Sequence, residues 1–122
     1  MKPHLLFVDD EAPIREMLSL YFHKRGYEVS TATESAEAVR LAEGNTFSAA
    51  ILDVDIAGEN GLALLTLLKA KYPKLPIIMF TGFDTNEDLL AKAMSLGADG
   101  FMRKTESLHD LLGIVERYAP VD

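Results

Sequence analysis

The chain has 122 residues, 48% of them hydrophobic and 25% charged, with no cysteine and a formal net charge of −7. This length and mix predict one soluble globular domain, 1–122, and exclude a disordered chain. The acidic balance opposes attraction to nucleic-acid phosphates, so we expect no direct nucleic-acid binding.

Two further expectations come from what the sequence lacks. Without cysteine there is no disulfide, thiolate metal site or cysteine nucleophile, and a reducing cytoplasm is the simplest location. No apolar run approaches the roughly 20 residues that cross a bilayer, and residues 1–4 lead into an apolar run rather than a secretion signal. We therefore expect no membrane contact.

Apolar runs and helical patterns alternate from the start of the chain. The first run, 5–8, is typical of a strand buried on both faces of a parallel sheet. A helix is predicted next, with Pro13 near its start and Gly26 just past its end. Its apolar residues at helical spacing are Ile14, Met17, Leu18 and Tyr21. Residues 27–32 then alternate, which favours a strand with one more solvated face or a strand at an edge position.

The middle of the chain repeats this order. A helix is predicted after Ser35, closed by Gly44 in a left-handed conformation, and the apolar run 49–52 predicts the third strand. Asn60 is a possible cap for the next helix. The apolar stripe of that helix is Leu64, Leu65, Leu68 and Tyr72.

Two more strands and helices complete the pattern. Residues 77–80 predict the fourth strand and 100–102 the fifth. Between them we expect a helix after Thr85, closed by Gly97. After Ser107 comes a last helical stripe, formed by Leu108, Leu111, Leu112 and Val115.

Strict alternation of strand and helix predicts an α/β fold. The expected architecture is a doubly wound, five-stranded parallel sheet with right-handed crossovers and helices on both faces. Pro120 halts the last helix, so the tail 119–122 is either a frayed end or the start of a linker.

Polar residues close the apolar runs. The first run ends in Asp9-Asp10-Glu11, the third strand in Asp53 and the fourth in Thr81, and the fifth is followed by Lys104. In such folds ligands bind outside the carboxyl ends of the strands, where these side chains converge. Close carboxylates repel one another unless a cation neutralises them, so the all-oxygen cluster predicts Mg²⁺. Beside it, Asp53 has the chemistry of a nucleophile toward a phosphoryl group.

Each of these residues also has an ordinary structural interpretation. Asp9 and Asp10 can serve as a helix N-terminal cap, and Asp53 can be a turn-former before a glycine-containing loop. Thr81 alone fits a cap, and Lys104 alone fits a solvated surface charge. Their joint placement at successive strand ends favours a site, because independent accidents at one edge are improbable.

At this point the chain resembles the receiver domains of two-component response regulators, of the chemotaxis-regulator kind. The resemblance covers nearly the whole chain and is carried by segments 7–11, 53–61, 81–82 and 97–104. It implies the flavodoxin-like strand order 2-1-3-4-5, and a protein that catalyses only its own phosphorylation and dephosphorylation rather than a substrate-turnover enzyme.

The resemblance also implies roles for individual residues. Asp53 would be the phosphoacceptor, with Mg²⁺ held by Asp10, by Asp53 and by the backbone carbonyl of Asp55, and with Asp9 assisting through water. Thr81 and Lys104 would bind the phosphoryl oxygens as catalytic residues. Thr81 and Phe101 would form the switch, although Phe101 also fits ordinary core.

Partners are implied by the same resemblance. A sensor histidine kinase or phosphotransfer protein would supply the phosphoryl group. A downstream output domain or protein would read the face formed by the fourth helix, fifth strand and fifth helix, through which the chain could also dimerise.

The sequence departs from the family pattern in two places. Ile56-Ala57 replaces the usual Met-Pro, which should loosen the loop after Asp53, and Thr105 replaces the usual proline after Lys104. Because a cis bond before a non-proline residue is costly, the Lys104–Thr105 loop is expected to be either strained or trans. Phe83, near the predicted acyl phosphate, could exclude water and lengthen the phosphorylated lifetime; an exposed loop residue is the alternative.

Two rival functions stay open. One is a pseudo-receiver, an interaction module with this fold that is no longer phosphorylated. The other is a metal-dependent phosphatase built on Asp53-Val54-Asp55, although Ala57 stands where such enzymes have threonine or valine.

Overall fold

The computed structural model describes residues 2–82 and 87–121. The helices are α1 (Ala12–His23), α2 (Ser35–Gly44), α3 (Gly61–Lys71), α4 (Glu87–Ser95) and α5 (Leu108–Tyr118). The strands are β1 (His4–Val8), β2 (Glu28–Ala32), β3 (Ala49–Leu52), β4 (Asp55–Ile56), β5 (Glu59–Asn60), β6 (Ile77–Thr81) and β7 (Gly100–Arg103).

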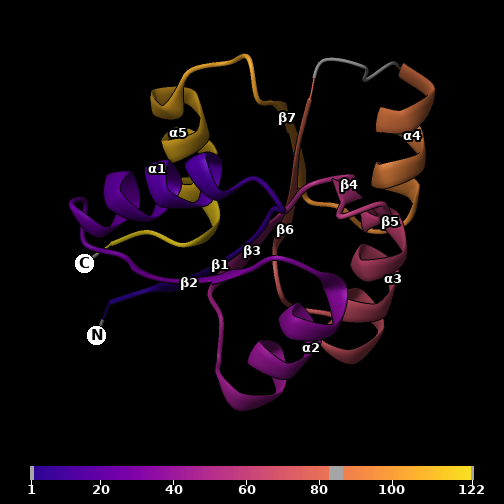
Figure 1. Cartoon of the computed structure of the whole chain (residues 1–122), viewed down its shortest axis with the longest axis horizontal. Coiled ribbons are helices and arrows are strands. Elements are labelled where there is room, and N and C mark those ends of the chain that lie inside the picture. The colour runs from indigo at the N-terminus through magenta and orange to yellow at the C-terminus, as the bar shows by residue number, and fades with distance from the viewer. Residues whose placement is uncertain (1, 83–86, 122) are drawn as a thin grey trace.

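Five of these strands form one parallel sheet in the order β2-β1-β3-β6-β7. Counting only these strands, this is the expected flavodoxin-like order 2-1-3-4-5, with β2 at an edge. Helices α1 and α5 lie together on one side of the sheet, whereas α2, α3 and α4 lie on the other (Figure 1). The predicted doubly wound α/β fold is therefore confirmed.

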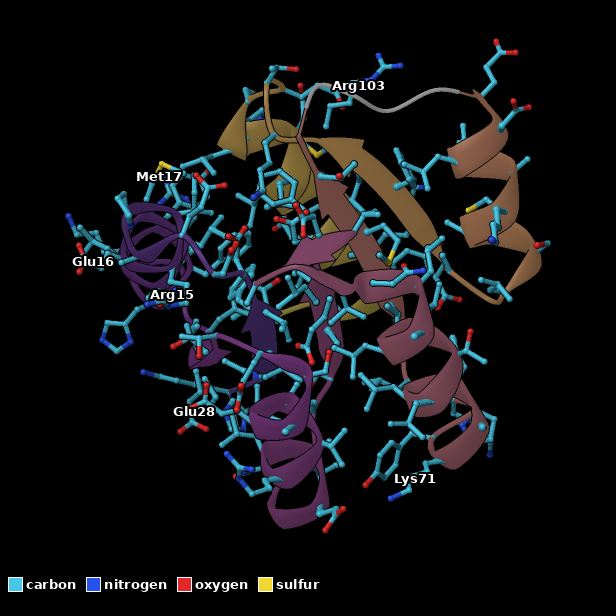
Figure 2. The ribbon with its side chains drawn as sticks, turned by 45° about the vertical axis from the view of Figure 1, so that its right-hand side comes forward. Arg15, Glu16, Met17, Glu28, Lys71 and Arg103 are labelled. Atoms are coloured by element: carbon cyan, nitrogen blue, oxygen red, sulfur yellow. The ribbon has the colours of Figure 1, made fainter. Side chains whose placement is uncertain are left out.

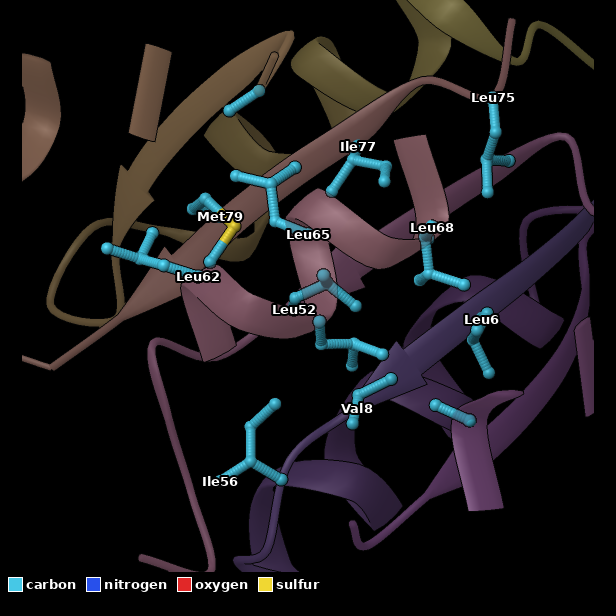
Figure 3. Close-up of a cluster of buried hydrophobic side chains, with 14 of the residues drawn as sticks. Leu6, Val8, Leu52, Ile56, Leu62, Leu65, Leu68, Leu75, Ile77 and Met79 are labelled. Atoms are coloured by element: carbon cyan, nitrogen blue, oxygen red, sulfur yellow. The ribbon is translucent and has the colours of Figure 1, made fainter. Parts of the chain in front are cut away.

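The uninterrupted apolar runs arise because the central strands are covered on both faces. In β1, Leu6 and Val8 enter the core under α2, α3 and α4, which also contains the side chains labelled in Figure 3. Leu5 and Phe7 enter the opposite core, together with residues of α1 and α5. Since neighbouring strand residues point to opposite faces, every position of such a strand has to be apolar.

Several predicted helix ends are confirmed. The Asn60 side chain accepts a hydrogen bond from the Leu62 amide at the start of α3, and Ser107 caps α5 in the same manner. Gly26 and Gly97 both adopt a positive φ just beyond their helices. Thr85, expected to precede α4, lies outside the described residues.

The prediction for Gly44 was wrong. It is the last residue of α2, and the chain leaves the helix at Asn45 in an extended conformation. The Asn45 side-chain amide donates to the Leu41 carbonyl, which satisfies one of the free carbonyls of the last turn. A left-handed glycine is therefore not needed to close this helix.

Nothing in the sequence pattern predicted the antiparallel hairpin β4-β5 that follows Asp53. Its strands are two residues long, too short for a visible alternation, and its tip is Ala57-Gly58 with φ of 53° and 80°. Two positive φ angles are typical of the tight turns that match strand twist. Proline, whose φ is fixed near −65°, cannot adopt this conformation at position 57. The segment after Asp53 is therefore a tight turn.

This turn predicts opposite effects for two substitutions at its tip. Ala57→Gly should stabilise the fold by about 0.5 to 1 kcal/mol, because alanine is strained in the left-handed region. Ala57→Pro should destabilise it by more than about 1 kcal/mol. Urea unfolding of the two variants measures both changes, and equal stability of Ala57→Pro and wild type would argue against the left-handed turn.

The carboxyl ends and the amino ends of the parallel strands lie at opposite ends of the molecule. In Figure 2, Arg103 at the end of β7 is at the top of the view, and Lys71 at the end of α3 is at the bottom. The carboxyl ends of the strands thus face one end of the molecule. Among the helices of residues 2–82 and 87–121, none combines the length and hydropathy that crossing a bilayer requires.

Candidate functional site

The acidic segment after β1 lies at the carboxyl edge of the sheet. The Asp9 side chain is 3% exposed, and its Oδ1 accepts a hydrogen bond from the Glu11 amide at 2.9 Å. Asp10 and Glu11 are exposed. The N-cap of α1 is Glu11, whose own side chain makes no cap hydrogen bond. Neither Asp9 nor Asp10 is the N-cap residue, although the Asp9 side chain binds the amide of that residue.

Asp53 follows β3 directly and is 6% exposed. Its backbone amide donates to the Val8 carbonyl at 3.0 Å, so β1 holds the residue at the edge of the sheet. Its Oδ1 accepts a hydrogen bond from the Asp55 amide at 3.2 Å. This contact links the buried carboxylate to the first residue of the hairpin.

These acidic residues converge in space. One carboxylate oxygen from each of Asp9, Asp10, Glu11 and Asp53 lies within 4.8 Å of the others. The expectation that Asp10 and Asp53 face each other across the strand ends is therefore met. Sequence reasoning placed Glu11 at the strand end but assigned it no role; its position directly after two acidic residues was the available signal.

Lys104 reaches into the same cluster. Its Nζ lies 2.6 Å from Asp9 Oδ2, 2.7 Å from Asp53 Oδ2 and 3.1 Å from Glu11 Oε1. The interpretation of Lys104 as a solvated surface charge is wrong, because its side chain is 12% exposed and paired with carboxylates. A divalent ion is thus not required to neutralise the whole cluster, since this ammonium group already supplies one positive charge.

The segment around Lys104 is placed by β6 and β7. The Lys104 amide donates to the carbonyl of Thr81, the buried last residue of β6, at 2.6 Å. All peptide bonds of the described residues are trans, including the one between Lys104 and Thr105. The lysine thus reaches the carboxylates without the proline of the family pattern. Phe101 is half-buried and packs against the core under α3 and α4.

Burial and pairing act in opposite directions on the two central charges. Burial raises the pKa of Asp53 above its ordinary value of 3.8, although the hydrogen bond and charge of Lys104 oppose this shift. Burial alone would lower the pKa of Lys104, but its hydrogen bonds to Asp53 and Asp9 hold it well above the ordinary value. Lys104 therefore carries its positive charge at neutral pH.

The raised pKa of Asp53 predicts a pH-dependent stability difference. Because the folded protein binds this proton more tightly than the unfolded chain, its contribution is favourable at low pH and is lost as pH rises through the folded pKa. Asp53→Asn should therefore gain stability relative to wild type between pH 4 and neutrality. Urea unfolding in EDTA across this range tests the sign; a variant less stable than wild type at neutral pH would show that pairing with Lys104 dominates.

The donor set suits a hard divalent cation. Carboxylate oxygens are the ligands that Mg²⁺ prefers, and the cluster contains both buried and exposed ones, which leaves room for water. Asp9, Asp10, Glu11 and Asp53 are the side chains that could hold the ion. Asp55 also lies next to the cluster, because its backbone amide donates to the Asp53 carboxylate.

One basic side chain contacts the backbone of the acidic segment. The guanidinium of Arg15, a residue that sequence reasoning did not single out, donates to the Asp9 carbonyl at 2.9 Å and fixes the segment after β1. Nothing in the sequence pattern marks such a side-chain-to-backbone contact. Phe83, proposed to exclude water, lies outside the described residues.

Comparison with known proteins agrees with this geometry. The family model described as "Response regulator receiver domain" matches residues 5–116. Protein PetR of Rhodobacter capsulatus is 34% identical over 110 residues, which covers 90% of this chain and 46% of PetR. This chain thus spans about half the length of that relative.

Two solved structures are also similar. Chemotaxis protein CheY4 of Vibrio cholerae has a TM-score of 0.90 at 28% identity, covering 97% of this chain and 99% of that one. A response regulator of Burkholderia pseudomallei, solved with a phosphorylated aspartic acid, calcium ion and citrate, has a TM-score of 0.86 at 26% identity, covering 92% and 65%. Given the family match over nearly its full length, the chain belongs to the response regulator receiver domains of two-component signalling.

Proposed function

We propose that the chain is a phosphorylation-controlled switch whose phosphoacceptor is Asp53. The convergence of four carboxylates, from Asp9, Asp10, Glu11 and Asp53, carries this proposal. Three of them, all but Asp10, also pair with the Lys104 ammonium group. The phosphorylated aspartic acid of the Burkholderia pseudomallei relative supports it. The family consists of receiver domains and not of substrate-turnover enzymes, which leaves no support for a phosphatase.

In the proposed reaction, a carboxylate oxygen of Asp53 forms a bond to phosphorus while the bond between phosphorus and the donor's leaving group breaks. The product is an acyl phosphate on Asp53 and a free leaving group that keeps the electron pair. Lys104, already 2.7 Å from Asp53, neutralises negative charge on the phosphoryl oxygens, and the Thr81 hydroxyl donates to one of them.

Asp10, Asp53 and the Asp55 carbonyl would hold Mg²⁺, with Asp9 assisting through water and Glu11 available as a further carboxylate. When bound, the ion neutralises charge that develops on the transferred group. Asp9 and Glu11 also keep Lys104 in place, since both contact its ammonium group.

The proposed output is a change of surface. Thr81 would shift toward the phosphoryl group and Phe101 would turn further inward, altering the face formed by α4, β7 and α5. A histidine kinase or phosphotransfer protein would act as donor in the cytoplasm. A downstream domain or protein would read the face, which is also the proposed surface for dimerisation. Residues 1–122 would act as one receiver domain.

Intact-protein mass spectrometry with acetyl phosphate tests this function against its rivals. A mass gain of one phosphoryl group with Mg²⁺, and none in EDTA, is expected. No gain under either condition would favour the pseudo-receiver, for which Ile56, Ala57 and Thr105 are the only sequence support. Continuous release of product from a small phosphomonoester would favour a phosphatase.

A further inference from the structure

The β4-β5 hairpin is tied to the start of α2 by one side chain. Oε1 of Glu59 accepts a hydrogen bond from the backbone amide of Ser35 at 3.1 Å. Ser35 is the first residue of α2, and the N-cap residue Glu34 makes no side-chain cap. Glu59 therefore satisfies a helix amide that has no partner within the helix, and its negative charge suits the positive end of the helix dipole.

The same hairpin begins at the acidic cluster. Asp55 is paired with Asn60, and Ile56 with Glu59, in the antiparallel register. Ile56 is fully buried, whereas an added Cβ at the tip residue Gly58 would meet nothing within 4 Å. The base of the hairpin is thus held by the core, and Glu59 ties the solvent-facing half to α2.

We propose that Glu59 is a positioning residue for the metal site: by fixing the hairpin to α2, it sets the position of Asp55 beside Asp53. This inference depends on the proposed Mg²⁺ site, in which the Asp55 carbonyl is a ligand. Partners that orient a ligand commonly tune metal affinity although they do not touch the ion. Coupling of this kind is reciprocal, so Mg²⁺ binding should also be felt at the Ser35 amide.

A matched set of variants separates tethering from loss of charge and from damage to α2. Glu59→Ala removes the hydrogen bond and the charge, whereas Glu59→Gln keeps an acceptor oxygen without the charge. Glu37→Ala is the control at the same helix start, because the Glu37 carboxylate accepts from the Thr33 amide at 2.7 Å and not from an amide of α2. Mg²⁺ titrations followed by amide NMR give the affinity and the Ser35 response of each variant, with thermal unfolding as a check on folding.

The expected result is that Glu59→Ala weakens Mg²⁺ binding by about threefold to tenfold, below the usual range for metal-site partners because the bond is exposed. It should also abolish the response of Ser35 to Mg²⁺. Glu59→Gln and Glu37→Ala should stay within about twofold of wild type.

Four outcomes overturn the inference. Wild-type affinity in Glu59→Ala, or equal weakening in Glu59→Gln, would show that no tether acts. Equal weakening in Glu37→Ala would show a general effect of α2. Failure of the wild type to bind Mg²⁺ would instead remove the proposed site itself, and with it this role for Glu59.

Discussion

Lys104→Met is expected to tighten Mg²⁺ binding while slowing phosphoryl transfer to Asp53. The Lys104 ammonium lies within 2.7 Å of both Asp9 and Asp53, so it competes with a metal ion for the same carboxylates. Removing this charge should raise Mg²⁺ affinity by about tenfold or more. The same charge stabilises the transferring phosphoryl group, and its loss should slow phosphorylation by about a hundredfold.

The variant should also become dependent on metal for its stability. Without Lys104 the paired carboxylates Asp9 and Asp53 are left uncompensated, which should cost about 3 to 5 kcal/mol in EDTA. Saturating Mg²⁺ should restore much of this loss, because ligand binding to the folded state stabilises it. Urea unfolding in both buffers, with the Mg²⁺ titration and the rate of mass gain from acetyl phosphate, measures all three effects.

Lys69→Met is the matched control for this experiment. Lys69 pairs with Asp99 at 2.8 Å. Asp99 directly precedes β7, so this pair lies at the amino ends of the strands, away from the acidic cluster. The Lys69→Met variant should lose some stability in either buffer without a change in Mg²⁺ affinity. Weaker Mg²⁺ binding by Lys104→Met than by wild type would contradict competition at the acidic cluster.

The second large effect is expected at Gly61. An added Cβ there would overlap the carbonyl oxygen of Asp53 and lie 2.9 Å from the Val54 Cα. Neither is the movable end of a side chain, so the backbone carrying the phosphoacceptor would have to shift. Gly61→Ala should therefore destabilise the fold by about 3 kcal/mol or more and strongly reduce phosphorylation.

Gly113→Ala, in contrast, is expected to stabilise the fold. Gly113 lies inside α5, and an added Cβ would meet nothing within 4 Å. Alanine is favoured over glycine in a helix, so this variant should gain up to about 1 kcal/mol. Urea unfolding compares the two variants directly. A Gly61→Ala protein as stable as wild type would refute the close approach to Asp53.

The parts of the fold visible in the sequence are those set by burial on both faces of the sheet. The runs at 5–8, 49–52 and 77–80 became β1, β3 and β6 because each position packs into one of two cores. Once parallel strands are expected, their carboxyl ends share one edge, which brings Asp10 and Asp53 together. These conclusions require only periodicity and topology.

The features that sequence reasoning missed depend on local geometry. The β4-β5 hairpin is too short for a periodic signal, and Asn45 takes over the role expected of Gly44 through one side-chain hydrogen bond. The charge balance of the site was misjudged because a lysine is long enough to reach three carboxylates. The sequence pattern alone does not reveal whether a long side chain such as that of Lys104 extends into solvent or reaches buried carboxylates.

The most direct test compares wild type with Asp53→Asn after incubation with acetyl phosphate and Mg²⁺, using intact-protein mass spectrometry. The account predicts a gain of one phosphoryl group on the wild type and none on the variant, which retains the other carboxylates and Lys104. The same gain on both proteins would place the acceptor elsewhere, and no gain on a wild type that binds Mg²⁺ would contradict the switch.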